Sequence, residues 1–314
     1  MNDSLPIREI SRLTGVNTVT LRAWERRYGL LKPLRTHKGH RLYGYEDVEL
    51  VNKIQSWLVR GLAISKVSEL LKTGETDINF LENNGESENI WQSNFQALLT
   101  IVADLNIGKL ESFIGEMFSV YPPDVIADCL VSPMLDHLQK NSFGDGVKRS
   151  IFTQRLCEYL HMLIQRQRNQ SKGRRVAIVQ VSKDINPLLN VLLHYGLTVN
   201  HYRCENVGLI DVNESVFLQK NLHLDAIIVY NDSTSSITEF KKLLSQLLQK
   251  ISIPILIAGK LNEALKQGEV GFSENLFIVD GYGQKAVVGK LNEIFPVNEN
   301  EDVLLTVKET GKNV

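Results

Sequence analysis

Three arginines, Arg22, Arg26 and Arg27, stand in the stretch TVTLRAWERRYGLLKP, which runs from Thr18 to Pro33. A guanidinium group is always charged, and its planar fork of donors can hold a phosphate or the edge of a guanine. A helix that carries such groups also fits the major groove of duplex DNA. The stretch can therefore read a polyanion. The alternative interpretation is an ordinary helix with a solvated basic face.

A helical projection divides this stretch into two faces. With about 3.6 residues per turn, Leu21, Trp24 and Tyr28 fall in one narrow sector of a helix over Thr18–Tyr28. Four polar residues fall on nearly the opposite sector: Thr18, Arg22, Glu25 and Arg26. We expect the aromatic stripe to pack inward and the arginine-bearing stripe to face outward.

A second basic segment, LRTHKGHRLYGYEDV, begins at Leu34. Two short extended runs flank residues 37–40, and Gly39 supplies the permissive backbone of a hairpin tip, so the segment predicts a small wing. Phosphate contacts from a wing position a recognition helix without specifying sequence. Its candidate residues are Arg35, His37, Lys38, His40, Arg41 and Tyr43. A basic hairpin can also be a solvated turn, but its place beside a basic helix favours nucleic-acid binding.

The elements around these residues follow the order of a winged helix-turn-helix domain, expected over residues 1–75. Apolar residues recur at helical spacing over 7–13, and Asn17 can cap the helix that follows a glycine turn. After the wing, helices are predicted over 46–60 and 64–72, each closed by a glycine.

The rest of the chain divides by pattern into a linker (76–88), a helical bundle (89–171), an α/β domain (172–296) and a polar tail (297–314). Four helical segments with short connections indicate the antiparallel bundle. Five runs of strand length, VAIVQV, LTVNHY, DAIIVY, IPILIA and LFIVDG, alternate with helical segments. This alternation predicts a doubly wound sheet of five parallel strands. The fold class is therefore multidomain, α and α/β.

Composition limits the possible functions. Of the 314 residues, 1–72 contain 13 Lys and Arg against 7 Asp and Glu, a net charge of +6, while the remainder contains 22 against 29, a net charge of -7. A basic module on an acidic body suits a polyanionic partner at one end. The three cysteines have no metal-ligand spacing and no catalytic motif is present, so we expect no metal, no cofactor and no enzyme activity. We also expect a cytoplasmic protein without a membrane partner, because no apolar run reaches spanning length.

The segment IREISRLTGVNTVTLRAWERRYGLLKPLRTHKGHRLYGYEDV resembles the winged helix-turn-helix of the MerR family of bacterial transcription regulators. The similarity covers residues 5–74. It is strongest to the branch that contains MlrA-type activators and CarH-type photoreceptors, in which a bundle and a cobalamin-binding-like, flavodoxin-type domain follow. The resemblance implies that these residues contact DNA: Thr18, Thr20, Arg22, Glu25, Arg26, Arg27, Tyr28, Arg35, His37, Lys38, His40, Arg41 and Tyr43.

Cobalamin binders of this branch ligate cobalt through the His of a D-x-H-x-x-G motif after the first strand. Here Asp184 is followed by Asn186, and neither His194 nor His201 is expected in that loop. In the bundle, Phe143 stands at the position of the family's Trp, and Thr153 with Gln154 stand at its Glu-His pair. The α/β domain is therefore interpreted as a scaffold, an interaction module or a site for another ligand.

The resemblance implies a homodimer that binds double-stranded promoter DNA and activates transcription by distorting it for RNA polymerase. The MlrA-like interpretation favours genes for biofilm or extracellular matrix. The alternative is a ligand- or light-responsive repressor of the CarH type, using cobalamin or another small molecule. A cobalamin-dependent enzyme and a protein-interaction adaptor are the rivals from other classes. The effector is unknown.

Overall fold

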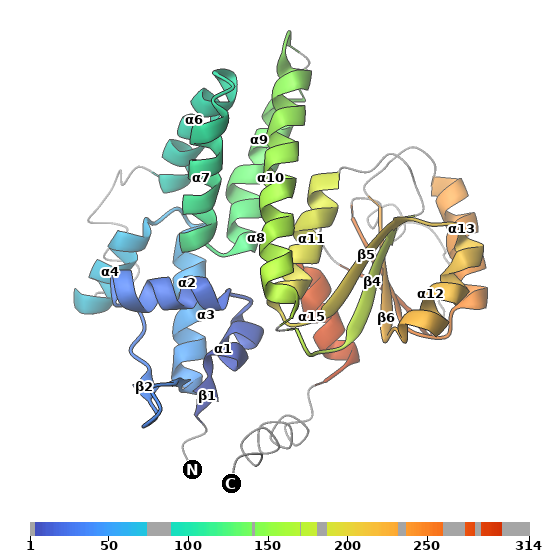
Figure 1. Cartoon of the computed structure of the whole chain (residues 1–314), viewed down its shortest axis with the longest axis horizontal. Helices are drawn as coiled ribbons and strands as arrows, with labels where there is room; N and C mark the ends of the chain where they lie inside the picture. Colours follow the sequence, from blue (N-terminus) through green and yellow to red (C-terminus); the bar gives the residue numbers. More distant parts are fainter. Residues whose placement is uncertain are drawn as a thin grey trace.

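The computed structural model of the chain is shown in Figure 1. It describes residues 4–73, 89–139, 142–169, 171–180, 187–231, 237–259, 274–279 and 284–296. The predicted linker (76–88) and tail (297–314) lie outside the described residues. None of the described helices is long and apolar enough to cross a membrane.

The N-terminal elements form the predicted helix-turn-helix with its wing. Its helices are α1 (Ile7–Thr14), α2 (Thr18–Ala23), η1 (Trp24–Tyr28), α3 (Tyr45–Val59) and α4 (Ile64–Thr73), and its strands are β1 (Leu5–Pro6), β2 (Leu34–Arg35) and β3 (Arg41–Tyr43). The hairpin prediction is confirmed, with Gly39 in the left-handed region at φ 81°. The strand β1 was not predicted. It pairs antiparallel with β3, so the wing is a three-stranded sheet in the order β1-β3-β2.

The recognition helix has the predicted extent but not a uniform geometry. Asn17 caps α2, its side-chain oxygen accepting a hydrogen bond from the Val19 amide at 2.9 Å. The last five residues, from Trp24 to Tyr28, form a π-helical turn. Gly29, at φ 63°, ends that turn. Single π-helical turns are rare and occur often at functional sites.

The bundle contains the four predicted helical segments, the third of which is interrupted. Its elements are α6 (Ile90–Ala103), α7 (Ile107–Val120), α8 (Pro123–Ile126), the π-helical η2 (Ala127–Val131), α9 (Ser132–His137) and α10 (Asp145–Arg168). Asn89 and Asn106 cap α6 and α7 through their side-chain oxygens. Side-chain caps of this kind satisfy amides that the first helical turn leaves without partners.

The α/β domain has the predicted five parallel strands. They are β4 (Arg175–Gln180), β5 (Arg203–Leu209), β6 (Ala226–Tyr230), β7 (Ile255–Ala258) and β8 (Leu276–Ile278), in the order β5-β4-β6-β7-β8. This is the strand order of the flavodoxin-like fold. The helices α11 (Pro187–Val199) and α15 (Gln284–Ile294) cover one face, and α12 (Ser215–Leu222), α13 (Ile237–Lys250) and the short η3 (Val212–Glu214) cover the other (Figure 1).

The predicted position of the second strand was wrong. The run LTVNHY was expected to form it, but its first three residues, 197–199, belong to α11, and β5 begins at Arg203. Leu197 is fully buried in the core between α11 and the sheet, so it continues the buried stripe of the helix. His201, expected in this strand, lies in the turn before it at φ 64°.

One hydrophobic core joins the helix-turn-helix to the bundle and to α11. Three hydrogen bonds cross the same boundary. The Trp24 indole donates to the Val120 carbonyl at 2.8 Å, the Trp91 indole donates to the Leu58 carbonyl at 2.6 Å, and the Asn17 amide group donates to the Tyr195 hydroxyl at 3.0 Å. The recognition helix is therefore fixed to the body of the protein.

We predict that Trp24→Phe destabilises the chain more than Trp57→Phe does. Both indoles are buried, but Trp57 Nε1 has no hydrogen-bond partner among the described residues, whereas Trp24 Nε1 binds Val120. Losing one partner of a buried hydrogen bond costs about 1–3 kcal/mol, so the gap between the two variants should have that size. Urea denaturation monitored by circular dichroism measures it. Equal losses would show that the Trp24 bond does not hold the domains together.

Candidate nucleic-acid interface

The outward edge of the recognition helix and the tip of the wing present basic side chains to solvent. Arg26 and Arg27 of η1 are exposed, and Arg22 of α2 is half-buried. The wing exposes four of the residues predicted to bind DNA, and they are Arg35, His37, Lys38 and His40. In the described part of the chain no carboxylate forms an ion pair with these residues except at Arg35.

Glu25 links the recognition helix to the wing. Its carboxylate accepts a hydrogen bond from Arg35 Nη2 at 2.8 Å through one oxygen and from Arg41 Nε through the other. Partial burial raises the pKa of the Glu25 carboxyl, but the hydrogen bonds and charges of Arg41 and then Arg35 outweigh this effect and hold the pKa below its usual value. Glu25 therefore stays charged and sets the position of β2 and β3 relative to the helix.

Three of the residues predicted to contact DNA are buried. Thr18 and Thr20 lie inside, although the helical projection placed Thr18 on the outer face. The projection allowed for one packing surface, but α2 packs against both α1 and α7. Tyr43 is buried in the wing sheet, and burial together with the nearby Glu25 charge raises the pKa of its hydroxyl to about 12. The side chains of these three residues are therefore not accessible to DNA at the surface.

The inward stripe of the projection is confirmed for two of its three residues. Leu21 and Trp24 are fully buried. Tyr28 is half-buried, and its carbonyl accepts a hydrogen bond from the Ser68 hydroxyl of α4 at 2.7 Å. This bond attaches the end of the recognition helix to the fourth helix of the domain.

Two apolar residues at the same surface were missed. Val19, in the first turn of α2, is 55% exposed, and Leu34, at the start of the wing, is 69% exposed. Apolar side chains are assigned to a core by default, so the sequence carried no signal for either. Beside exposed arginines, an apolar group can contact the methyl group of thymine in the major groove.

The described residues of this chain do not fit cobalamin. His194 lies on α11, and its Nε2 stands 3.1 Å from the carbonyl of Cys204, the second residue of β5. That position is at the amino end of the sheet, whereas the family's ligand follows the carboxyl end of the first strand. Phe143 is fully exposed, and Gln154 is exposed and hydrogen-bonded to Glu158. The residues Asp184 and Asn186 of the loop lie outside the described part of the chain.

Residues 5–73 match the model of the MerR HTH family regulatory proteins. HTH-type transcriptional regulator MlrA of Escherichia coli (strain K12) is 37% identical over 133 residues, which is 42% of this chain and 51% of that protein. HTH-type transcriptional repressor CarH of Myxococcus xanthus is 27% identical over 132 residues, 40% of this chain and 43% of that protein. The chain thus matches about half the length of these curated relatives.

Among solved structures, a cobalamin-binding protein from Desulfitobacterium hafniense DCB-2 aligns with 12% sequence identity and a TM-score of 0.29, covering 63% of this chain and 97% of that one. A likeness at this TM-score says nothing about ligand or function. The flavodoxin-like assignment rests on the strand order described above.

We predict that Glu25→Gln lowers the free energy of unfolding by about 1 kcal/mol at pH 7, the size expected for two partly exposed ion pairs. The pKa of the Glu25 carboxyl is lower in the folded protein than its ordinary value of 4.5. Its charge therefore stabilises the folded state fully above pH 4.5, and this stabilisation is lost as the pH falls through the pKa of the folded state. The difference between parent and variant should therefore shrink below pH 4.5. Denaturant titrations at pH 7 and at pH 3.5 measure it.

Glu293→Gln is the control, since Glu293 forms a single exposed pair with Lys290. It should leave stability unchanged at both pH values. A Glu25 variant that matches this control at pH 7 would contradict the linking role of Glu25.

Proposed function

Since residues 5–73 are a MerR HTH domain, we propose that this chain is a transcription regulator that binds double-stranded DNA in a sequence-specific manner. The observation that carries the proposal is the edge at which the outward arginines of the recognition helix meet the exposed basic residues of the wing. Glu25 ties the two elements together, so that they face a duplex as one rigid surface.

The residues of this surface have different roles in the proposal. Arg22 and Arg26 enter the major groove and contact base edges or the adjacent phosphates, with Arg27 beside them. The wing holds the DNA backbone through Arg35, His37, Lys38, His40 and Arg41. Glu25 acts as a positioning residue, because its two carboxylate oxygens are occupied by wing arginines rather than directed at a base.

The regulator acts as a homodimer on promoter DNA in this proposal. Two recognition helices related by a two-fold axis enter successive major grooves, so the operator has matching symmetry. Bending and untwisting a promoter costs about 1–6 kcal/mol, which the wing and helix contacts offset. Such distortion brings the promoter elements into a geometry that RNA polymerase can engage. The likeness to MlrA supports activation, with biofilm or extracellular-matrix genes as the targets that the resemblance implies.

Repression is the second candidate mode of action. It is supported by the relative from Myxococcus xanthus, which is named a transcriptional repressor and matches a similar length of this chain. A cobalamin-dependent form of this mode does not suit the chain, because the side chains at the family's bundle positions are exposed or replaced.

We predict that Arg26→Ala weakens binding to the DNA upstream of the protein's own gene about tenfold or more, with relaxed sequence preference, as expected for a base-contacting arginine. Lys38→Ala should weaken binding to all duplexes similarly and lower the slope of log affinity against log salt by about one. Fluorescence anisotropy with labelled duplexes at several salt concentrations measures both effects.

Arg166→Ala is the matched control, because Arg166 is an exposed arginine of α10 that lies outside the interface. It should bind DNA as the parent does. If the Arg26 and Lys38 variants also bind as the parent does, the assigned surface is not the one that contacts DNA.

A further inference from the structure

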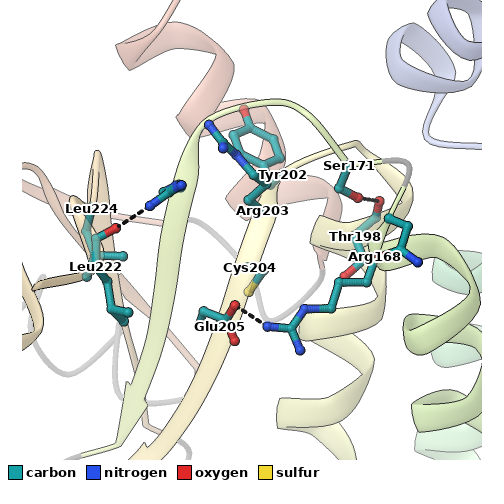
Figure 2. Close-up of a pocket in the computed structure, with 11 residues that line it drawn as sticks. Arg168, Ser171, Thr198, Tyr202, Arg203, Cys204, Glu205, Leu222 and Leu224 are labelled. Atoms are coloured by element: carbon teal, nitrogen blue, oxygen red, sulfur yellow. Dashed lines mark hydrogen bonds and ion pairs between the residues drawn. The ribbon is translucent and has the colours of Figure 1, made fainter.

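A pocket of about 350 Å³ lies where the end of α10 meets the amino ends of β4 and β5. Figure 2 shows the residues that line it, which come from α10, α11, β4, β5 and the end of α12. The site is separate from the carboxyl ends of the strands, where open α/β sheets bind their usual ligands. It is also separate from the DNA-binding surface described above.

Three arginines line this pocket, against one carboxylate. Arg168 pairs with Glu205. The other two donate hydrogen bonds to carbonyl oxygens. Arg175 Nη1 donates to the Leu222 carbonyl at 3.2 Å, and Arg203 Nε donates to the Gly173 carbonyl at 2.8 Å. A guanidinium group has five N–H donors, so each of these two contacts leaves donors free for a ligand. The lining carries an excess of two positive charges.

The remaining walls suit a ligand that is only partly charged. Leu222 and Leu224 form an apolar wall beside Arg175 on the α12 side of the sheet, and the buried Tyr202 and Cys204 line the pocket from the α11 side. The volume is at the lower end of the range for small-molecule sites, about 300–1,000 Å³. A duplex or a protein segment does not fit a space of this size, but a small metabolite does.

We propose that this pocket binds a small organic phosphate. A phosphate group accepts several charge-assisted hydrogen bonds at once, which matches a lining with arginine donors left free. The organic part lies against the leucine wall. The chemistry of the pocket requires no metal and no cobalamin.

The pocket wall adjoins one of the parts of the α/β domain that contact the helix-turn-helix. Tyr202 lines the pocket, and the preceding residue, His201, is close enough to α1 that the charges of Arg8, Glu9 and Arg12 act on its ring. One residue earlier, the Asn200 side chain lies beside Gly15, in the turn between α1 and α2. A ligand that shifts the turn 200–202 therefore acts on α1 and on Gly15, which lead into the recognition helix.

This contact gives the pocket a regulatory role, a part of the inference that rests on the proposed function. The turn 200–202 takes two positions, and the ligand in the pocket makes better contacts with one of them. Because the two positions also differ in their affinity for DNA, binding of the ligand changes that affinity. The His201 carbonyl accepts a hydrogen bond from the Gly173 amide at 3.0 Å, which links the turn directly to the segment before β4.

Isothermal titration calorimetry of the full chain with inorganic pyrophosphate tests the binding site. We expect saturable binding that becomes about tenfold weaker or more in the double variant Arg175→Gln, Arg203→Gln, because each lost charged hydrogen bond has an effect of that order. Arg166→Gln should bind as the parent does. No saturable heat, an undiminished affinity in the double variant, or binding of citrate in place of pyrophosphate would overturn the proposal.

The regulatory part is tested with labelled duplex at constant ionic strength, kept equal with sodium chloride because DNA binding depends on salt. Pyrophosphate should change the affinity for DNA at least threefold in the parent and leave it unchanged in the double variant. If the double variant loses DNA affinity without pyrophosphate, the arginines belong to the DNA-binding surface, and the pocket proposal fails. Calorimetry needs no DNA, so it tests the pocket even if the chain does not bind DNA. Failure of the pocket proposal and failure of the proposed function are therefore distinguished.

Discussion

Burial of Trp24 is the constraint on which the rest of the structure depends. This residue stands in the middle of the recognition helix, is fully buried, and donates its indole hydrogen to the Val120 carbonyl at the end of α7. A recognition helix in an isolated domain needs only its own small core. Here the same side chain serves the core of the helix-turn-helix and the junction with the bundle, so the direction of the arginines is set by both.

Because Trp24 is buried, its neighbours in the chain point in other directions and have different roles. Trp24 faces inward, Glu25 turns sideways to the wing arginines, and Arg26 faces solvent. The π-helical turn that contains all three widens the helix at this point, which is consistent with the functional use of such turns. Charge separation along the chain, basic in the first 72 residues and acidic afterwards, places the positive charge at this end.

The sequence predicted the elements better than it predicted the surfaces between them. Periodicity located the recognition helix, the wing and the five strands, because each depends on local spacing. It failed at Thr18 and Tyr43, because local spacing does not show that α2 packs against α7 or that β3 pairs with β1. It also misplaced the second strand, because Leu197 is as compatible with a buried helix as with a strand. The ion pairs of Glu25 and the arginine pocket depend on residues distant in sequence, which local patterns do not reveal.

Selection of bound fragments from a random pool of duplex DNA tests the central claim most directly. The full-length protein should enrich a defined motif with two-fold symmetry at physiological salt, because two identical recognition helices read it. A selection that enriches no motif, or that recovers duplexes only through general affinity for the backbone, would contradict the claim that this chain reads DNA sequence through the edge shared by Arg22, Arg26 and the wing.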